Sequence, residues 1–289
     1  MTEIEYDVCL NCTRLATIHL SETVRTIGAG AFAHCALTSY DMIPDTVTKI
    51  DACALFGNDK ITGPIKVSKN VTHLGFDGFN ECKYNATRKS GCYELSFHSH
   101  NRWIPSDLEL SEEEAHFGAG FCYNPFGGCY NITSLEVDPD NEYYESIENT
   151  IYSKVSKNGN CDGYHYNDTW ALCGTKFSKL KSSTTVIENN CFDTMCVVSY
   201  NYNIFKTTDK IKTFGQNITR VGYRAFADDA DTLIGNNFTF EINSTINIID
   251  SFAFFRVEMQ KAEFRSESET THIYEYAFAS TALNSTASD

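Results

Sequence analysis

The sequence predicts a repeat solenoid built mainly from short β-strands. A Val-x-x-Ile phrase, followed by a small residue and then a Phe, recurs at intervals of 23 and 24 residues, at 23–35, 46–56 and 70–82. Looser copies follow at 186–192, 218–226, 246–254 and 273–278. A fixed period of this length indicates units that bury their apolar edges only by stacking on their neighbours.

Each regular unit is expected to open with a short strand. Apolar residues alternate with a polar residue at 15–20, 37–42, 61–67 and 132–137, as in Ile-His-Leu at 18–20. Alternation with a period of two predicts a strand with one buried face. Pro44, Gly63 and Pro64 lie around these segments, where a solenoid turns a corner.

The Val-x-x-Ile segment is expected to form a second short strand, and the Gly-x-x-Ala-Phe after it a tight helical turn. The small residue permits a close approach of neighbouring backbones, and the Phe fills the core. Stacking of the units then predicts an aromatic spine composed of Phe32, Phe56, Phe79, Phe226, Phe254 and Phe278.

The full pattern Leu-x-x-Ile-x-Leu-x-x-x-Val-x-x-Ile-Gly-x-x-Ala-Phe-x-x-Cys resembles the BspA-like leucine-rich repeats, most closely over 15–82 and more loosely over 185–280. Residues 135–153 resemble a variant unit of that family, whereas the Asn ladder of ordinary leucine-rich repeats is missing from the sequence. The resemblance implies a right-handed, leucine-rich-repeat-like coil with short strands and helical turns. It also implies display on an anaerobic bacterium or a parasitic protist, adhesion to host proteins or cells, and no catalytic residues.

We expect a single domain over residues 1–289, because a solenoid has no single core to outgrow. Its regular units cover about 15–82 and 185–280, and irregular inserted units cover about 83–184. Within the irregular part, the Gly-, Asn- and Asp-rich segment at 156–168 is expected to protrude as a loop.

Acidic residues outnumber basic ones, with 38 Asp and Glu against 23 Lys and Arg and a net charge of −15. Such a surface repels nucleic acid and anionic membranes, which are bound through basic patches. The sequence has no run of 18 apolar residues for a membrane-spanning helix, and its first seven residues do not resemble a secretory signal. Surface display therefore requires a signal and an anchor outside this chain, or an unconventional route.

Asn-x-Ser/Thr sequons occur nine times and favour an N-glycosylated, eukaryotic secretory protein, although an Asn- and Thr-rich composition is the alternative explanation. Asn70 and Asn217 each precede the first apolar residue of a repeat phrase, which predicts the same solvent-facing corner for both. The nine positions are Asn11, Asn70, Asn85, Asn131, Asn167, Asn217, Asn237, Asn243 and Asn284.

The twelve cysteines fall into two groups. Cys12, Cys35, Cys82 and Cys129 match the repeat cysteine and are expected to be small buried apolar groups. The even total and short local spacings favour disulfides in an oxidising compartment. Plausible pairs are Cys82–Cys92, Cys122–Cys129, Cys161–Cys173 and Cys191–Cys196, two of which conflict with the first grouping, and the connectivity stays open.

The sequence gives no positive indication of an enzyme, a metal or a cofactor. Cys9-x-x-Cys12 is a weak zinc signal, because no second Cys-x-x-Cys or Cys2His2 spacing follows it. The two histidines of 98–100 and the glutamates at 112–114 are more typical of a solvated loop. The paired glycines at 28 and 30, and at 118 and 120, lack the third glycine of a dinucleotide-binding loop.

The leading hypothesis is a non-enzymatic cell-surface adhesin that binds host proteins or cells through the broad strand face. The central residue of each apolar-x-apolar core points to solvent, although each such residue alone is more simply an ordinary solvated position. Together they predict a ligand-binding row of His19, Asp41, Lys66, Ser96 and Glu136, flanked by Thr17 and Ser39.

The expected partner is a host extracellular or cell-surface protein, with no nucleic acid and no direct membrane insertion. Two other hypotheses stay open. One is a structural or antigenic coat protein whose glycans crowd the strand face. The other is an intracellular protein–protein interaction scaffold with reduced thiols.

Overall fold

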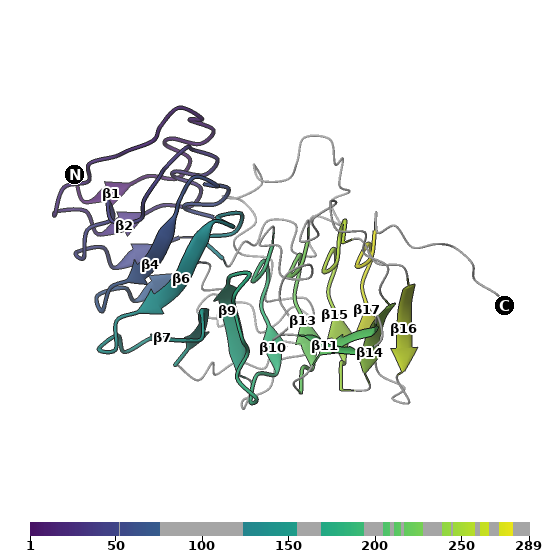
Figure 1. Cartoon of the computed structure of the whole chain (residues 1–289). Helices are drawn as coiled ribbons and strands as arrows, with labels where there is room; N and C mark the ends of the chain where they lie inside the picture. The colour runs from purple at the N-terminus through teal and green to yellow at the C-terminus, as the bar shows by residue number, and fades with distance from the viewer. Residues whose placement is uncertain are drawn as a thin grey trace, which may run out of the picture.

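The structure is a computed structural model that describes residues 1–51, 53–75, 124–154, 169–193, 205–208, 211–214, 217–227, 239–243, 245–257, 261–265 and 272–279. These residues form an elongated array of short strands that follows the sequence, with β1 and β2 at one end and β16 and β17 at the other (Figure 1). No helix occurs within the described ranges. The described part of the fold is therefore made of strands and turns.

The Val-x-x-Ile segments form the expected short parallel strands, each two residues long. One sheet contains β1 (Glu3–Ile4), β2 (Thr26–Ile27), β3 (Lys49–Ile50) and β5 (His73–Leu74). The same ladder recurs in β10 (Val186–Ile187), β13 (Arg220–Val221), β15 (Ile248–Ile249) and β17 (His272–Ile273). Equivalent apolar residues pair in register, as Ile27 does with Ile50, and both are fully buried.

The apolar-x-apolar segments form strands in part of the chain. β4 (Gly63–Val67) pairs in parallel with β6 (Ile132–Val137). A second group contains β12 (Ile211–Phe214), β14 (Thr239–Asn243) and β16 (Lys261–Arg265) in parallel, with β11 (Phe205–Thr208) antiparallel on β12. The expected strands at 15–20 and 37–42 do not form.

Local hydrogen bonds explain why the segment at 37–42 turns instead of extending. The Asp41 amide donates to the Ser39 hydroxyl at 3.1 Å, and the Ile43 amide donates to the Tyr40 carbonyl at 3.0 Å. These bonds close tight turns and take amides that a continued ladder would use.

The Gly-x-x-Ala-Phe segment forms non-helical turns where a helical turn was expected. The Ala31 amide donates back to Gly28 at 3.1 Å, but the Phe32 amide donates to Ala54 of the next unit at 2.9 Å. Gly30 and His34 have positive φ values of 61° and 52°, which a right-handed helix does not allow. Alternate amides therefore join neighbouring units instead of closing a helix.

A close backbone approach explains the glycine that begins this turn. A Cβ atom on Gly28 would lie 2.7 Å from the amide nitrogen of Tyr6 in the preceding unit. At the equivalent position, a Cβ on Gly222 would lie 2.7 Å from the amide nitrogen of Asn189.

The predicted aromatic spine is confirmed at Phe226, Phe254 and Phe278, is wrong at Phe56, and includes Phe192, which was not predicted. Phe192, Phe226, Phe254 and Phe278 stack with ring centroids 5.2–5.3 Å apart and interplanar angles of 6–17°. In the second unit Leu55 fills this position and is fully buried, whereas Phe56 is half-buried and meets His34 edge-on. The 23-residue period takes Phe32 to Leu55, so Phe56 is one residue out of register. Phe79 lies outside the described residues.

The variant unit folds as an antiparallel hairpin that extends the sheet of β10, β13, β15 and β17. β7 (Tyr144–Ile147), β8 (Thr150–Ser153) and β9 (Trp170–Gly174) pair antiparallel, and β9 then pairs in parallel with β10. Glu148 and Asn149 form its two-residue loop with φ values of 46° and 65°. Two successive positive φ values are typical of a type I′ turn, which matches the twist of the flanking strands.

Individual asparagine side chains form hydrogen bonds with backbone groups of neighbouring units. Asn58 is fully buried, and its amide donates to the carbonyls of Phe32 and Leu55 at 2.7 and 2.8 Å while its oxygen accepts from the Leu37 amide at 3.2 Å. Asn141 likewise donates to Ser68 and Val71. Buried turn carbonyls are thus satisfied without the regular Asn ladder of other leucine-rich repeats.

Candidate binding surface

The described members of the predicted row lie at the surface. The exposed side chains are Thr17, His19, Asp41, Lys66 and Glu136. Ser39 is half-buried, and its hydroxyl is engaged by the Asp41 amide. Ser96 lies outside the described residues.

Lys66 and Glu136 are immediate neighbours, although seventy residues separate them in the sequence. They are in-register partners on β4 and β6. The flanking Ile65 and Leu135 are also paired, and both are buried. Because paired residues of neighbouring parallel strands point to the same side of the sheet, Lys66 and Glu136 share one face. The Glu136 carboxylate there accepts a hydrogen bond from the Ser134 hydroxyl at 2.8 Å.

The pairing of β4 with β6 changes the expected order of the ligand-binding row. Ser96 was expected between Lys66 and Glu136, but β6 pairs directly with β4. The turns agree, because the Leu55 amide donates to the Pro125 carbonyl at 2.9 Å and the Gly57 amide donates to Gly127 at 2.7 Å. The turn at 124–129 therefore stacks directly on the second unit.

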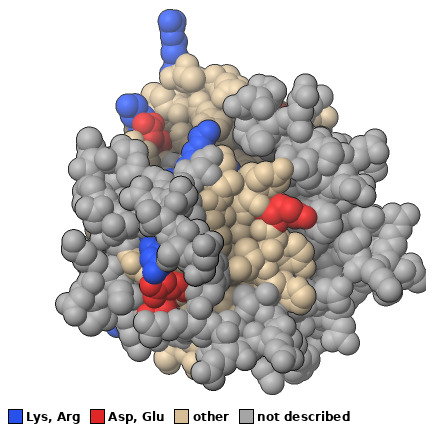
Figure 2. Space-filling model, turned by 90° about the vertical axis from the view of Figure 1, so that its right-hand side faces the viewer, with Lys and Arg blue, Asp and Glu red and all other residues tan. Residues whose placement is uncertain are grey.

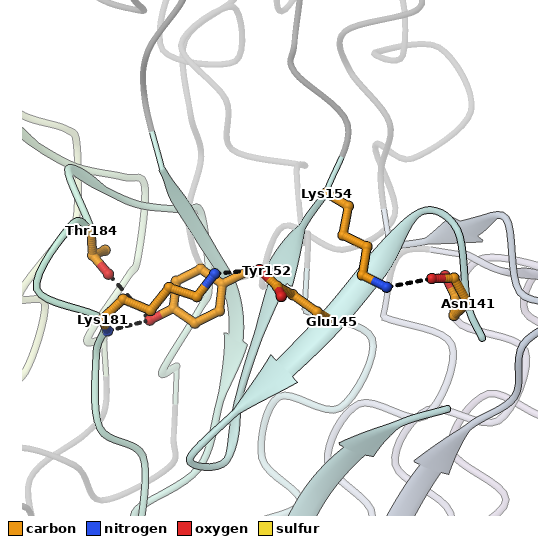
Figure 3. Close-up of polar contacts among 6 residues, drawn as sticks. All are labelled: Asn141, Glu145, Tyr152, Lys154, Lys181 and Thr184. Atoms are coloured by element: carbon orange, nitrogen blue, oxygen red, sulfur yellow. Dashed lines mark hydrogen bonds and ion pairs between the residues drawn. The ribbon is translucent and has the colours of Figure 1, made fainter. Parts of the chain in front are cut away.

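A network beside β6 adds polar groups that sequence reasoning missed (Figure 3). Lys181 forms an ion pair with Glu145 of β7, and its ammonium lies 4.4 Å from the centre of the Tyr152 ring on β8. The Lys181 amide also donates to the Tyr152 hydroxyl at 2.9 Å, and Thr184 lies 3.2 Å from that hydroxyl. The Lys154 ammonium donates to the Asn141 carbonyl at 2.6 Å.

Tyr152 serves as the buried anchor of this network. Its side chain is fully buried, and burial raises the pKa of its hydroxyl, while hydrogen bonds from Thr184 and Lys181 partly oppose that rise. The tyrosine stays protonated at neutral pH, so the network fixes the hairpin and offers no nucleophile.

Two further ion pairs hold the scaffold between β10 and β15. Arg220 contacts Asp250 at 2.6 Å, with 5% and 11% of their side chains exposed. Arg224 binds both carboxylate oxygens of Asp193, at 2.8 and 3.2 Å. Burial raises the pKa of Asp250, and the Arg220 charge opposes that rise. Their burial makes these pairs structural.

The end of the array that carries β16 and β17 differs from the strand row in its exposed side chains. Figure 2 shows scattered charged side chains there among uncharged described residues, with no large patch of one sign. Ile273, Tyr274 and Tyr276 are exposed at this end. The strand row is therefore the better candidate for charge-complementary binding.

Four of the predicted glycosylation positions are exposed in the structure: Asn11, Asn70, Asn131 and Asn217. The Asn70 amide donates to the Asp45 carbonyl at 2.8 Å, and the Asn131 amide donates to the Asp59 carbonyl at 2.7 Å. Asn243 ends β14. Asn85, Asn167, Asn237 and Asn284 lie outside the described residues.

No disulfide joins the cysteines that the structure describes, which are Cys9, Cys12, Cys35, Cys53, Cys129, Cys173 and Cys191. The structure therefore gives no support to the predicted disulfides at Cys129, Cys173 and Cys191, and the Cys82–Cys92 pair lies outside the described residues. Burial raises the pKa of Cys35 to about 11 and that of Cys129 to about 12. These two match the expected buried repeat cysteine, whereas Cys12 is exposed.

No group of three or more metal-ligating side chains occurs in the part of the chain that the structure describes. No helix in those same ranges has the length and apolar character needed to cross a bilayer. The arrangement offers exposed charges on a rigid sheet face, which suits recognition of another surface.

The repeat match decides the family. The model of the BspA type Leucine rich repeat region matches residues 1–92 and 198–288 in six copies. The chain belongs to this BspA-type family. The resemblance seen in the repeat residues is thus confirmed. A search of curated proteins gave no match.

Similar solved structures were also found, and one of them supports the fold. The BspA-type chain is similar to a leucine rich cell surface protein from Faecalibacterium prausnitzii A2-165, with a TM-score of 0.51, 16% identity, and coverage of 97% of this chain and 67% of that one. It is also similar to the pneumococcal vaccine antigen PcpA, with a TM-score of 0.43, 12% identity, and coverage of 97% and 71%. At these identities the first likeness shows the fold alone.

Proposed function

We propose that this BspA-type chain is a non-enzymatic, surface-displayed adhesin that binds a host extracellular or cell-surface protein through the strand row. The observation that carries the proposal is the pairing of Lys66 with Glu136 on a rigid parallel strand pair. His19 and Asp41 are exposed at the equivalent sequence positions of the two preceding units, where no strand forms. Alternating charges on fixed backbone favour a specific protein partner over a uniformly charged polymer.

The remaining parts of the proposal follow from family and charge. We place the protein at the cell surface or outside the cell, as the F. prausnitzii protein is named. The net charge of −15 disfavours nucleic acid and anionic membranes as partners. One buried apolar cluster runs from Ile4 to Ala277, which supports a single right-handed solenoid domain.

A second candidate is a glycosylated coat protein that binds nothing tightly. Asn131 favours it, because this exposed sequon immediately precedes β6 and lies five residues from Glu136. A glycan there would stand beside the row and hinder a protein partner.

The experiment is a binding series on immobilised host matrix proteins and host cells. The test variant carries Lys66→Glu and Glu136→Lys, which reverses the charge order and keeps the net charge. The matched control carries Glu22→Lys and Lys60→Glu, two exposed positions away from the β4–β6 pair. We expect saturable binding by the wild type and the control, and a loss of at least about tenfold in affinity for the test variant.

Equal binding by all three proteins would refute the strand row as the site. No saturable binding by the unglycosylated wild type would refute adhesion. Binding that is lost only in the glycosylated protein would favour the coat. Intact mass of the native protein, before and after glycan removal and reduction, tests the location separately: an unmodified chain with reduced thiols would favour the intracellular scaffold.

A further inference from the structure

Two cysteines that the binding function does not use lie in one tight turn at the N-terminal end of the array. The Cys12 amide donates to the Cys9 carbonyl at 3.0 Å, which closes a four-residue turn. Its third residue, Asn11, has a φ of 59°, as in a type II turn. The ends of such a turn have Cα atoms less than about 7 Å apart, and a disulfide needs Cα atoms about 4.4–6.8 Å apart.

The neighbouring unit holds this turn in place. The Cys9 amide donates to the Ala31 carbonyl at 2.8 Å, and the Asn11 amide donates to the Ala33 carbonyl at 2.9 Å. Both acceptors belong to the rigid turn that precedes Cys35. The two thiol-bearing residues are thus fixed relative to one another before any bond forms.

The thiols differ in access. Cys12 is exposed, Cys9 is half-buried, and Cys35 is buried beneath them with its Sγ donating to the Cys9 carbonyl at 3.1 Å. Burial raises the pKa of Cys9, and the neighbouring Cys12 raises it further. Because Cys12 is the most accessible of the three thiols, an oxidant meets it first.

We propose that Cys9 and Cys12 form a thiol–disulfide exchange site, in which Cys12 attacks a small disulfide such as oxidised glutathione and Cys9 resolves the product. The Cys12 thiolate attacks one glutathione sulfur, forms a mixed disulfide and releases one glutathione thiolate. The Cys9 thiolate then attacks the Cys12 sulfur, forms the Cys9–Cys12 bond and releases the second glutathione. The two protein thiols lose two electrons and two protons in total, and the oxidised glutathione becomes two reduced molecules.

The bridge would lock the first turn of the array. The turn connects the first unit to the second through backbone hydrogen bonds and the Cys35 thiol contact described above, and Cys9 also packs against the core. A redox-dependent link at this position would make the stability of the terminal unit respond to the compartment. This inference does not depend on adhesion.

The test uses the full chain, made without glycans and fully reduced. The protein is equilibrated with oxidised and reduced glutathione, quenched with N-ethylmaleimide and digested with trypsin. Peptide 1–14 contains Cys9 and Cys12 and no other cysteine, because Arg14 is the first basic residue. We expect this peptide to become lighter by two hydrogen atoms, while Cys35 and Cys129 are alkylated only after denaturation.

Two variants separate the roles of the thiols. Cys9→Ser should trap glutathione on Cys12 and raise the mixed disulfide at least ~tenfold over the wild type, since a resolving thiol in the same turn has a millimolar or higher effective concentration. Cys12→Ser should give neither a bridge nor a stable adduct, and Cys129→Ser should behave as the wild type. The proposal is overturned if glutathione persists on wild-type Cys12, if the bridge forms to Cys35, or if peptide 1–14 stays fully alkylated.

Discussion

The second unit offers a sharp test of repeat register, because two adjacent apolar residues compete for one place in the core. Leu55 is fully buried in the position that Phe32 and Phe126 occupy in the flanking units. Replacing it by Ala removes buried methyl groups and leaves a cavity. Leu→Ala changes of this kind cost about 3–5 kcal/mol.

The neighbouring Phe56 should matter less despite its larger side chain. It is half-buried, and its ring meets His34 edge-on with centroids 5.5 Å apart. Phe56→Ala loses one edge-to-face contact, worth about 0.5–1.5 kcal/mol, and part of its burial. We expect a total cost of about 1–2 kcal/mol.

The assay is urea unfolding of both variants, followed by tyrosine fluorescence and by circular dichroism. Comparison is valid where the slope with urea equals that of the wild type. The reasoning predicts that Leu55→Ala is the more destabilising change. A larger loss for Phe56→Ala would refute the register and restore Phe56 to the spine.

Three further predictions address the scaffold. Phe226→Ala removes a fully buried ring stacked on both sides and should cost about 4–6 kcal/mol. Phe226→Leu should cost less, about 1–3 kcal/mol for the two lost ring contacts, because a leucine fills the equivalent position in the second unit; equal losses in thermal unfolding would contradict this. Arg220→Met strands the buried Asp250 carboxylate and should cost about 3–5 kcal/mol at pH 7. The pKa of Asp250 in the folded state lies above its ordinary value of 3.8, so Asp250 favours the folded protein most below pH 3.8 and less as the pH rises. The cost of Arg220→Met should therefore be smaller at pH 4 than at pH 7. A cost that does not change with pH would contradict this role of the ion pair. Asn58→Ala leaves three buried backbone groups without their partner and should cost about 2–4 kcal/mol, and Asn58→Cys should restore part of the loss, since Cys129 holds the equivalent place and donates to Leu55 at 3.2 Å; no difference between the two in urea unfolding would refute the shared role.

Much of the architecture could be predicted because it depends on local periodicity. The Val-x-x-Ile strands and the Phe stack of the C-terminal half follow from apolar spacing alone. The helical turns could not be excluded in the same way. Gly30 and His34 adopt left-handed φ values because alternate amides bond to the next unit, and that contact is not encoded within one repeat.

The sequence predicted which residues of the candidate surface are exposed, but not which of them lie next to one another. Alternation correctly placed Lys66 and Glu136 on the outer face. Their pairing could not be foreseen, because it joins two strands that lie far apart in the sequence. The ion pair between Glu145 and Lys181 was missed for a similar reason, since a hairpin and a long sequence separation bring the two together.

The central claim is that Lys66 and Glu136 belong to one binding surface because β6 lies directly on β4. The measurement that tests it most directly is disulfide trapping of a Lys66→Cys, Glu136→Cys double variant under mild oxidation, mapped by peptide mass. Adjacent parallel strands lie about 4.8 Å apart, and a disulfide spans Cα atoms no more than about 6.8 Å apart. The account predicts a rapid, high-yield link between positions 66 and 136. An intervening strand would double the separation, so the absence of that link in the folded protein would contradict the account.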